Sequence, residues 1–126
     1  MRITTVKDML DENMDIELIF KCEFDEYGLA TIRKVGNNFV TTMYQNRLNL
    51  DLETDEEIIK ELGEGNSFGG SYSDLNQAMC ECFSFWRLKD KVTINSDRVI
   101  PVFSSYKEAA KYLKEIDEKF MICIIN

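Results

Sequence analysis

The alternation of apolar and polar residues predicts strands in the N-terminal half of the chain. From Ile16 to Phe24 every second residue is apolar, which is the period of a strand with one side on a core. Two shorter segments, 29–35 and 39–45, follow after turn sequences that contain glycine or asparagine. Because such short connections join antiparallel neighbours, we expect an antiparallel meander. The leucines from Leu48 to Leu52 also alternate with polar residues and predict a fourth strand, as an edge.

Helical spacing with capping residues predicts four helices. In a capping box, Ser or Thr at the N-cap is followed three residues later by Glu, as in the pairs Thr54/Glu57 and Ser105/Glu108. Gly63 is placed to end the first of these two helices. The expected helices run from a cap at Thr4 or Thr5 to Asp11, from Asp55 to Leu62, from a cap at Ser73 to about Trp86, and from Ser105 to near Asp117. A strand over residues 80–88 remains an alternative, because Phe83 and Phe85 also alternate.

The C-terminal part predicts strands that complete the same sheet. Segments 92–94 and 98–103 have strand character, and Pro101 suggests that the second has a free edge. Residues 120–125 are almost all apolar, so we expect a central strand buried on both faces. If this strand pairs parallel to 98–103, the crossover through the helix is right-handed. The expected fold class is α+β, one domain over residues 1–126: an antiparallel β-meander, two middle helices and a β-β-α-β unit completing one sheet.

A short segment resembles a known family. Residues 98–109, Arg-Val-Ile-Pro-Val-Phe-Ser-Ser-Tyr-Lys-Glu-Ala, combine a strand, a Pro-x-Phe sequence and a serine-capped acidic helix. This combination resembles the corresponding segment of the SseB family of bacterial proteins. The resemblance covers about a tenth of the chain and includes no catalytic residue, so we infer neither family membership nor an activity from it.

Charge is distributed in blocks, and this matters more than the net charge of −8. Residues 8–26 contain eight acids against one lysine, and residues 51–64 contain seven acids against one lysine. Between them, residues 27–50 contain Arg33, Lys34 and Arg47 and no acid. Acidic blocks repel nucleic acid and anionic membranes and attract basic protein surfaces. These three bases could form a second, basic face, whose use the sequence does not indicate.

Several kinds of chemistry lack the residues they need. The chain has no histidine, which is the commonest general base and zinc ligand. Its four cysteines include the C-x-C sequence Cys80-Glu81-Cys82 but no C-x-x-C pair, so we expect structural thiols and no metal or cofactor. The longest apolar run is too short to span a bilayer. Without a secretory leader pattern, the expected compartment is the cytoplasm.

A glycine-rich segment at residues 63–71 invites comparison with phosphate-binding loops. It has no lysine before a final Ser or Thr, as a P-loop requires, and Phe68 occupies a position where a dinucleotide fingerprint requires glycine. We therefore expect a loop over residues 64–72 that exposes Phe68 and Tyr72. A small-molecule or nucleotide-binding accessory domain that uses this loop remains an alternative.

The acidic segment supports a functional expectation. Glu57 and Glu61 repel each other across one helical turn, an arrangement that stability alone does not favour. Same-face residues of a strand lie about 6.6 Å apart, close to the phosphate spacing of nucleic acid, so Asp51 and Glu53 could present a phosphate-like row. The candidate partner-binding residues are Asp51, Glu53, Asp55, Glu56, Glu57, Glu61, Glu64, Phe68 and Tyr72.

From this surface we expect a non-enzymatic inhibitor of phage or mobile-element type, anti-CRISPR-like or anti-restriction-like. Such a protein would occupy the basic, nucleic-acid-binding surface of a host protein without binding nucleic acid or membrane itself. The alternative is a toxin-neutralising immunity protein, which would also use an acidic surface to bind a basic partner. An enzyme ranks below both.

Overall fold

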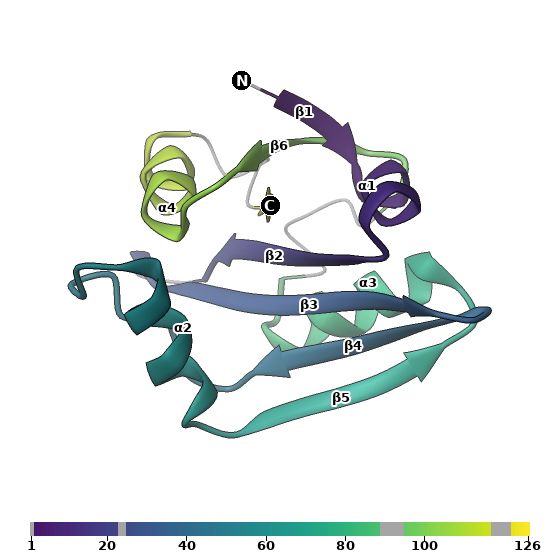
Figure 1. Cartoon of the computed structure of the whole chain (residues 1–126), viewed down its shortest axis with the longest axis horizontal. Helices are drawn as coiled ribbons and strands as arrows, with labels where there is room; N and C mark the ends of the chain where they lie inside the picture. Colours follow the sequence, from purple (N-terminus) through teal and green to yellow (C-terminus); the bar gives the residue numbers. More distant parts are fainter. Residues whose placement is uncertain (1, 23–24, 89–94, 117–121) are drawn as a thin grey trace.

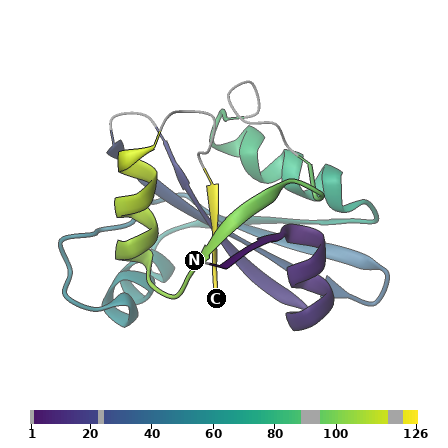
Figure 2. The ribbon, with the colours of Figure 1, turned by 90° about the horizontal axis from the view of Figure 1, so that it is seen from above.

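The computed structural model describes residues 2–22, 25–88, 95–116 and 122–126, and over these it shows a mixed seven-stranded sheet between helices (Figures 1 and 2). In chain order the elements are β1 (Arg2–Thr5), α1 (Val6–Asn13), β2 (Asp15–Lys21), β3 (Tyr27–Val35), β4 (Asn38–Tyr44), α2 (Asp55–Gly63), β5 (Ser67–Tyr72), α3 (Leu75–Phe85), β6 (Val99–Phe103), α4 (Tyr106–Glu115) and β7 (Ile122–Ile125).

The strands follow the order β1-β6-β7-β2-β3-β4-β5. All neighbouring pairs are antiparallel except β6 and β7, which are parallel and are connected through α4. The registers Leu18↔Ala30 and Ile32↔Thr41 define the meander of β2, β3 and β4. This confirms the expected α+β class and the N-terminal antiparallel strands, and the last two strands do pair in parallel, which the sequence had left open.

Helices cover both faces of the sheet, so there are two apolar cores. The side chains of α1 and α3 pack on one face with Leu18 and Phe20, and those of α2 and α4 pack on the other with Ile19 (Figure 2). The expectation that β2 has only one face on a core is therefore wrong. The second core explains why Ile19 is apolar at a position where the alternation calls for a polar residue.

The prediction of a fourth strand at Leu48 to Leu52 is also wrong. Residues 45–54 contain no strand, and their leucines fix an irregular segment by packing into the core beneath α2 and α4. The strand that completes this side of the sheet is β5, whose Gly69 pairs with Thr42 of β4. The loop expected over 64–72 is thus mostly an edge strand, whose backbone pairs with β4 although its sequence lacks a strand pattern.

Three of the four expected N-cap residues are confirmed, and the fourth cap lies one residue further along the chain. Thr5, Thr54 and Ser105 are the N-caps of α1, α2 and α4, whereas α3 is capped by Asp74, one residue after the expected Ser73. The helix over 75–85 excludes the alternative strand there. Gly63 is the last residue of α2, without the left-handed conformation that usually requires glycine.

At the C-terminus, β7 lies third in the sheet with all four residues buried, which confirms the central strand. β6 lies between β1 and β7, so the free edge inferred from Pro101 is wrong. The edge on this side is β1, which the hydrophobic pattern did not predict. The strand expected at 92–94 falls outside the described residues.

Candidate functional site

The candidate carboxylates lie on α2, on the segment that leads into it and at its C-cap, on the same face of the sheet as α4 (Figure 1). Because residues 45–54 are irregular, Asp51 and Glu53 do not stand in a strand, and the phosphate-like spacing expected for them is wrong. Six of the seven carboxylate side chains belong to exposed residues, which we call the α2 acidic surface: Asp51, Glu53, Glu56, Glu57, Glu61 and Glu64.

The seventh carboxylate, Asp55, is half-buried and turned toward α4. Its Oδ2 atom accepts a hydrogen bond from the backbone N–H of Tyr106 at 3.0 Å, and its Oδ1 atom accepts one from the Ser105 hydroxyl at 3.5 Å. The N–H of Tyr106 is one of the first-turn donors that a helix cannot satisfy internally. Asp55 therefore joins α2 to the N-terminus of α4, and its charge is already used within the fold.

Two carboxylates of the α2 acidic surface are held in place by neutral groups. The Thr54 hydroxyl accepts from the Glu57 N–H at 3.2 Å, which is the N-cap bond of the expected capping box. The Glu57 Oε1 atom accepts from the same hydroxyl at 3.0 Å, rather than from the Thr54 backbone N–H as in the full motif. The Asn49 amide donates to Glu61 Oε2 at 3.3 Å. These contacts fix the side chains and leave their negative charge uncompensated.

The two acidic blocks of the chain differ in whether their carboxylates form ion pairs. Within the described residues, no cation lies within ion-pairing distance of the α2 acidic surface. Every ion pair found there neutralises an acid of the N-terminal block: Arg2–Glu12 at 2.6 Å, Lys21–Asp25 at 3.4 Å, Lys34–Asp11 at 3.9 Å and Arg47–Glu26 at 3.1 Å. Two of the three bases between the blocks, Lys34 and Arg47, thus have an internal role.

The two candidate aromatic anchors lie on the other face of the sheet. On β5, Phe68 pairs with Met43 and Tyr72 with Phe39, both of which pack into the core beneath α1 and α3. The Phe68 ring contacts Phe85 of α3, with 5.2 Å between ring centroids. Phe68 is 49% exposed and Tyr72 is half-buried. Neither ring flanks α2, so the carboxylates and the aromatic residues do not form one surface.

A polar groove lies beside α2, over the sheet. It has a volume of about 540 Å³, and its lining includes Glu17, Arg33 and Tyr44 from the strands and Ile59 from α2. The Tyr106 hydroxyl donates to Glu17 Oε2 at 2.6 Å. Burial raises the pKa of Glu17 even though this hydrogen bond lowers it. We did not single out Glu17 from the sequence, although it shares a strand face with Ile19.

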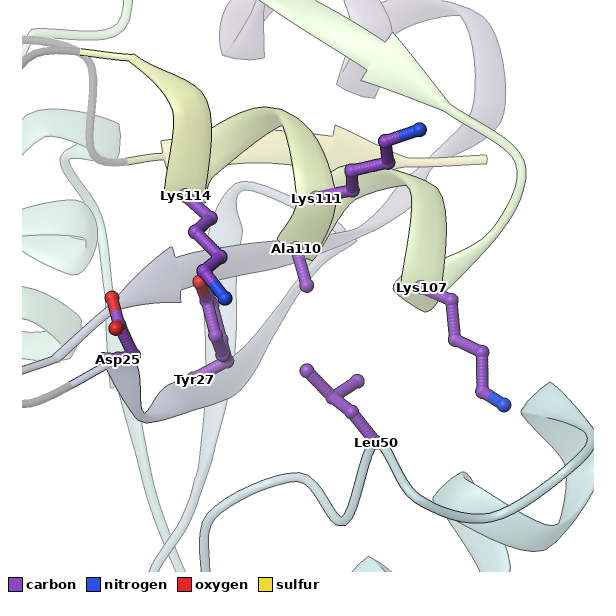
Figure 3. Close-up of a pocket in the computed structure, with 7 residues that line it drawn as sticks. All are labelled: Asp25, Tyr27, Leu50, Lys107, Ala110, Lys111 and Lys114. Carbon is purple, nitrogen blue, oxygen red and sulfur yellow. The ribbon is translucent and has the colours of Figure 1, made fainter.

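A second hollow, of about 380 Å³, lies between α4 and the segment that contains Leu50 (Figure 3). Its lining is basic and apolar, which contrasts with the adjoining α2 acidic surface. Three lysines of α4, at spacings of four and three residues, line it together with Tyr27, Leu50 and Ala110: Lys107, Lys111 and Lys114. The spacing of these lysines was visible in the sequence, but not the cavity beneath them.

Nucleophilic and metal chemistry find little support in the described residues. Burial raises the pKa of the Cys82 and Cys123 thiols to about 12, so both stay protonated at neutral pH. In this part of the chain, no group of three or more His, Cys, Asp and Glu side chains is placed to hold a metal ion. The helices described here are all too short or too polar to cross a membrane.

The glycine-rich segment does not have the shape of a phosphate cradle. Its first residue ends α2, and from Ser67 to Tyr72 the backbone is extended and paired with β4. A phosphate-binding loop instead curls its N–H groups around the ligand before a helix.

Comparison of the chain with protein-family models, with curated proteins and with solved structures found no match.

Proposed function

We propose that the protein is a non-enzymatic inhibitor that binds the basic surface of another protein through the α2 acidic surface. The observation that supports this most directly is the contrast between the acidic blocks. The chain uses bases to neutralise Asp11, Glu12, Asp25 and Glu26, but within the described residues it pairs none with the six carboxylates of the α2 acidic surface. A partner that supplies cations would gain from a surface left in this state.

The local structure favours such binding in two ways. The summed field of six carboxylates attracts a basic partner over about a Debye length and raises the association rate. Glu57 and Glu61 are already held by Thr54 and Asn49, so less side-chain entropy is lost when they pair with a partner. The surface is therefore both charged and partly ordered before binding.

The partner class follows from the same electrostatics. Dense clusters of lysine and arginine are characteristic of nucleic-acid-binding surfaces, so we propose that the partner is a cytoplasmic host protein of this kind. An inhibitor of phage or mobile-element type that acts against a defence nuclease would bind a surface of this kind. An immunity protein that covers a basic toxin would also bind such a surface. The identity of the captured partner distinguishes the inhibitor from the immunity protein.

The test reverses three carboxylates that make no side-chain hydrogen bond or ion pair within the described residues: Glu53→Lys, Glu56→Lys and Glu64→Lys in one variant. The matched control applies the same change in net charge to exposed acids elsewhere, with Glu81→Lys, Asp97→Lys and Glu115→Lys. The wild-type chain is expected to capture a basic protein from host lysate, identified by intact mass, and to release it at high salt.

The first variant should lose this partner and the control should keep it. Equal capture by all three proteins would contradict the proposal. Equal loss in both variants would show that only net charge matters, and this would also count against a defined binding surface.

A further inference from the structure

The hollow between α4 and the segment around Leu50 has the size and lining of a small-ligand site. Its volume of about 380 Å³ lies at the lower end of the range for ligand pockets, which begins at about 300 Å³. Leu50, Ala110 and Tyr27 provide an apolar surface. Of the α4 lysines that line the hollow, Lys114 reaches toward Tyr27 in Figure 3, whereas Lys111 is directed away from Leu50 and Tyr27. This volume suits a single small molecule rather than a polymer.

The three lysines of α4 have no described counter-ion. No ion pair of the described residues involves Lys107, Lys111 or Lys114, and Asp25, the one acid in the lining, is paired with Lys21 at 3.4 Å. Lys107 also lies in the first turn of α4, where the helix dipole disfavours a cation. Lys114 lies in the last turn, where the dipole favours a cation, but neither ion pairing nor helix stability accounts for Lys107 in a chain with a net charge of −8.

A second, independent feature of the same hollow is an unsatisfied hydroxyl. Tyr27 is only 5% exposed, and within the described part of the chain its hydroxyl has no hydrogen-bond partner. Lys114 extends toward Tyr27 in Figure 3. Since a buried hydroxyl without a partner has lost the hydrogen bonds that it would make to water, an acceptor that reached it on displacement of the Lys114 side chain would be favoured. Lys114 is exposed, and such side chains reorient rapidly.

We propose that this hollow binds a small organic anion, an apolar body that carries one phosphate or carboxylate group. The apolar body lies on Leu50, Ala110 and the Tyr27 ring. The anionic group lies beside Lys114 and accepts a hydrogen bond from the Tyr27 hydroxyl, while Lys107 and Lys111 add to the positive field of α4. The site is separate from the glycine-rich segment and from the carboxylates of the α2 acidic surface.

The test titrates the full chain with phenyl phosphate and follows backbone amide shifts by NMR. We expect saturable shifts at Tyr27, at Leu50 and along α4. Inorganic phosphate lacks the apolar body and phenol lacks the charge, so each should bind at least about tenfold more weakly. Benzoate in a parallel titration shows whether a carboxylate substitutes for the phosphate.

Two variants test the assigned groups. Replacing all three lysines (Lys107→Met, Lys111→Met and Lys114→Met) should abolish saturation, whereas Lys60→Met, which removes an exposed lysine of α2, should leave it unchanged. Tyr27→Phe should weaken binding about tenfold without lowering the melting temperature, because the lost hydroxyl had no partner.

Three results would overturn the proposal. One is the absence of saturable shifts with both phenyl phosphate and benzoate. Another is a loss of binding in Lys60→Met as large as that in the triple-lysine variant, which would indicate that the anion is attracted to any lysine. The third is unchanged binding in both the triple-lysine variant and Tyr27→Phe, which would leave the lysines as a screen for the nearby acids and the hydroxyl as an unsatisfied core atom.

Discussion

The hydroxyl of Tyr106 donates a 2.6 Å hydrogen bond to Glu17, and this contact joins the first residue of α4 to the middle of the sheet. The backbone N–H of the same tyrosine donates to Asp55 of α2 at 3.0 Å. One residue therefore connects two helices and a central strand through two carboxylates. Burial is the larger cause, and the hydrogen bond to Glu17 the second, of a raised pKa for the Tyr106 hydroxyl, which therefore stays protonated and able to donate at neutral pH.

Glu17→Gln should stabilise the protein at neutral pH. Because burial raises the pKa of Glu17 in the folded state, the native protein binds this proton more tightly than the unfolded chain does, for which the reference value is 4.5. Its contribution is therefore fully favourable below pH 4.5 and declines as the pH rises through the folded pKa. Glutamine keeps an acceptor for Tyr106 and removes the charge.

Thermal unfolding over a pH series checks this. The melting temperature of Glu17→Gln should exceed that of the wild type at neutral pH, and the two should converge below pH 4.5. Glu53→Gln, an exposed carboxylate, controls for the same change in net charge. A less stable Glu17→Gln protein at neutral pH would show that the hydrogen bond to the carboxylate outweighs desolvation.

Asp55→Ala should destabilise the protein by about 1–2 kcal/mol, the usual cost of losing a helix-capping acceptor. The change leaves the Tyr106 N–H without its acceptor and removes the link between α2 and α4. Glu56→Ala is the matched control, because it removes an exposed acid from the same first turn of α2 and should fall within about 0.5 kcal/mol of the wild type. Urea denaturation of both variants measures the difference. Similar free energies of unfolding would show that Asp55 is not a structural residue.

The sequence predicted elements wherever local chemistry decides the structure. Capping residues such as Thr54 and Ser105 satisfy donors of their own helix, so their positions are determined within a few residues of chain. The central position of β7 followed from its apolar composition on both faces. Each of these inferences needed no knowledge of which distant segment lies alongside.

Where the structure depends on distant partners, sequence reasoning failed. The leucines from Leu48 to Leu52 alternate as in a strand, yet they pack into a core assembled from α2 and α4. β5, with its two glycines and two serines, has no strand pattern, and its extended backbone is paired with β4, a partner that its own sequence does not reveal. The same limit applies to the candidate site, where Asp55 was assigned to the partner surface but binds Tyr106, which is 51 residues away.

Substitution of two glycines should have opposite effects on stability. A Cβ atom added at Gly69 would lie 2.8 Å from the backbone oxygen of Thr41, which cannot move without disturbing the ladder between β4 and β5. Gly69→Ala should therefore destabilise by about 1–3 kcal/mol. At Gly63 an added Cβ meets nothing within 4 Å and the backbone is helical, so Gly63→Ala should stabilise by about 0.5–1 kcal/mol. Chemical denaturation distinguishes the two signs, and a stabilising Gly69→Ala would contradict the register assigned to β5.

Arg47→Ala should shift the fluorescence of Trp86 to longer wavelength. The Arg47 guanidinium carbon lies 4.0 Å from the centroid of the Trp86 ring, and Trp86 is 8% exposed. Removal of the arginine uncovers the ring and should cost about 0.5–1 kcal/mol of stability. The chain has one tryptophan, so its emission reports on this site alone.

Two further variants separate the ring contact from the ion pair that Arg47 makes with Glu26 at 3.1 Å. Glu26→Gln removes the ion pair but leaves Arg47 on the ring, so the emission maximum should stay at the wild-type value. Arg33→Ala removes an exposed arginine with no described contact to Trp86 and should also leave it unchanged. A red shift in Glu26→Gln as large as that in Arg47→Ala would mean that the ion pair, rather than attraction to the ring, keeps the guanidinium over Trp86.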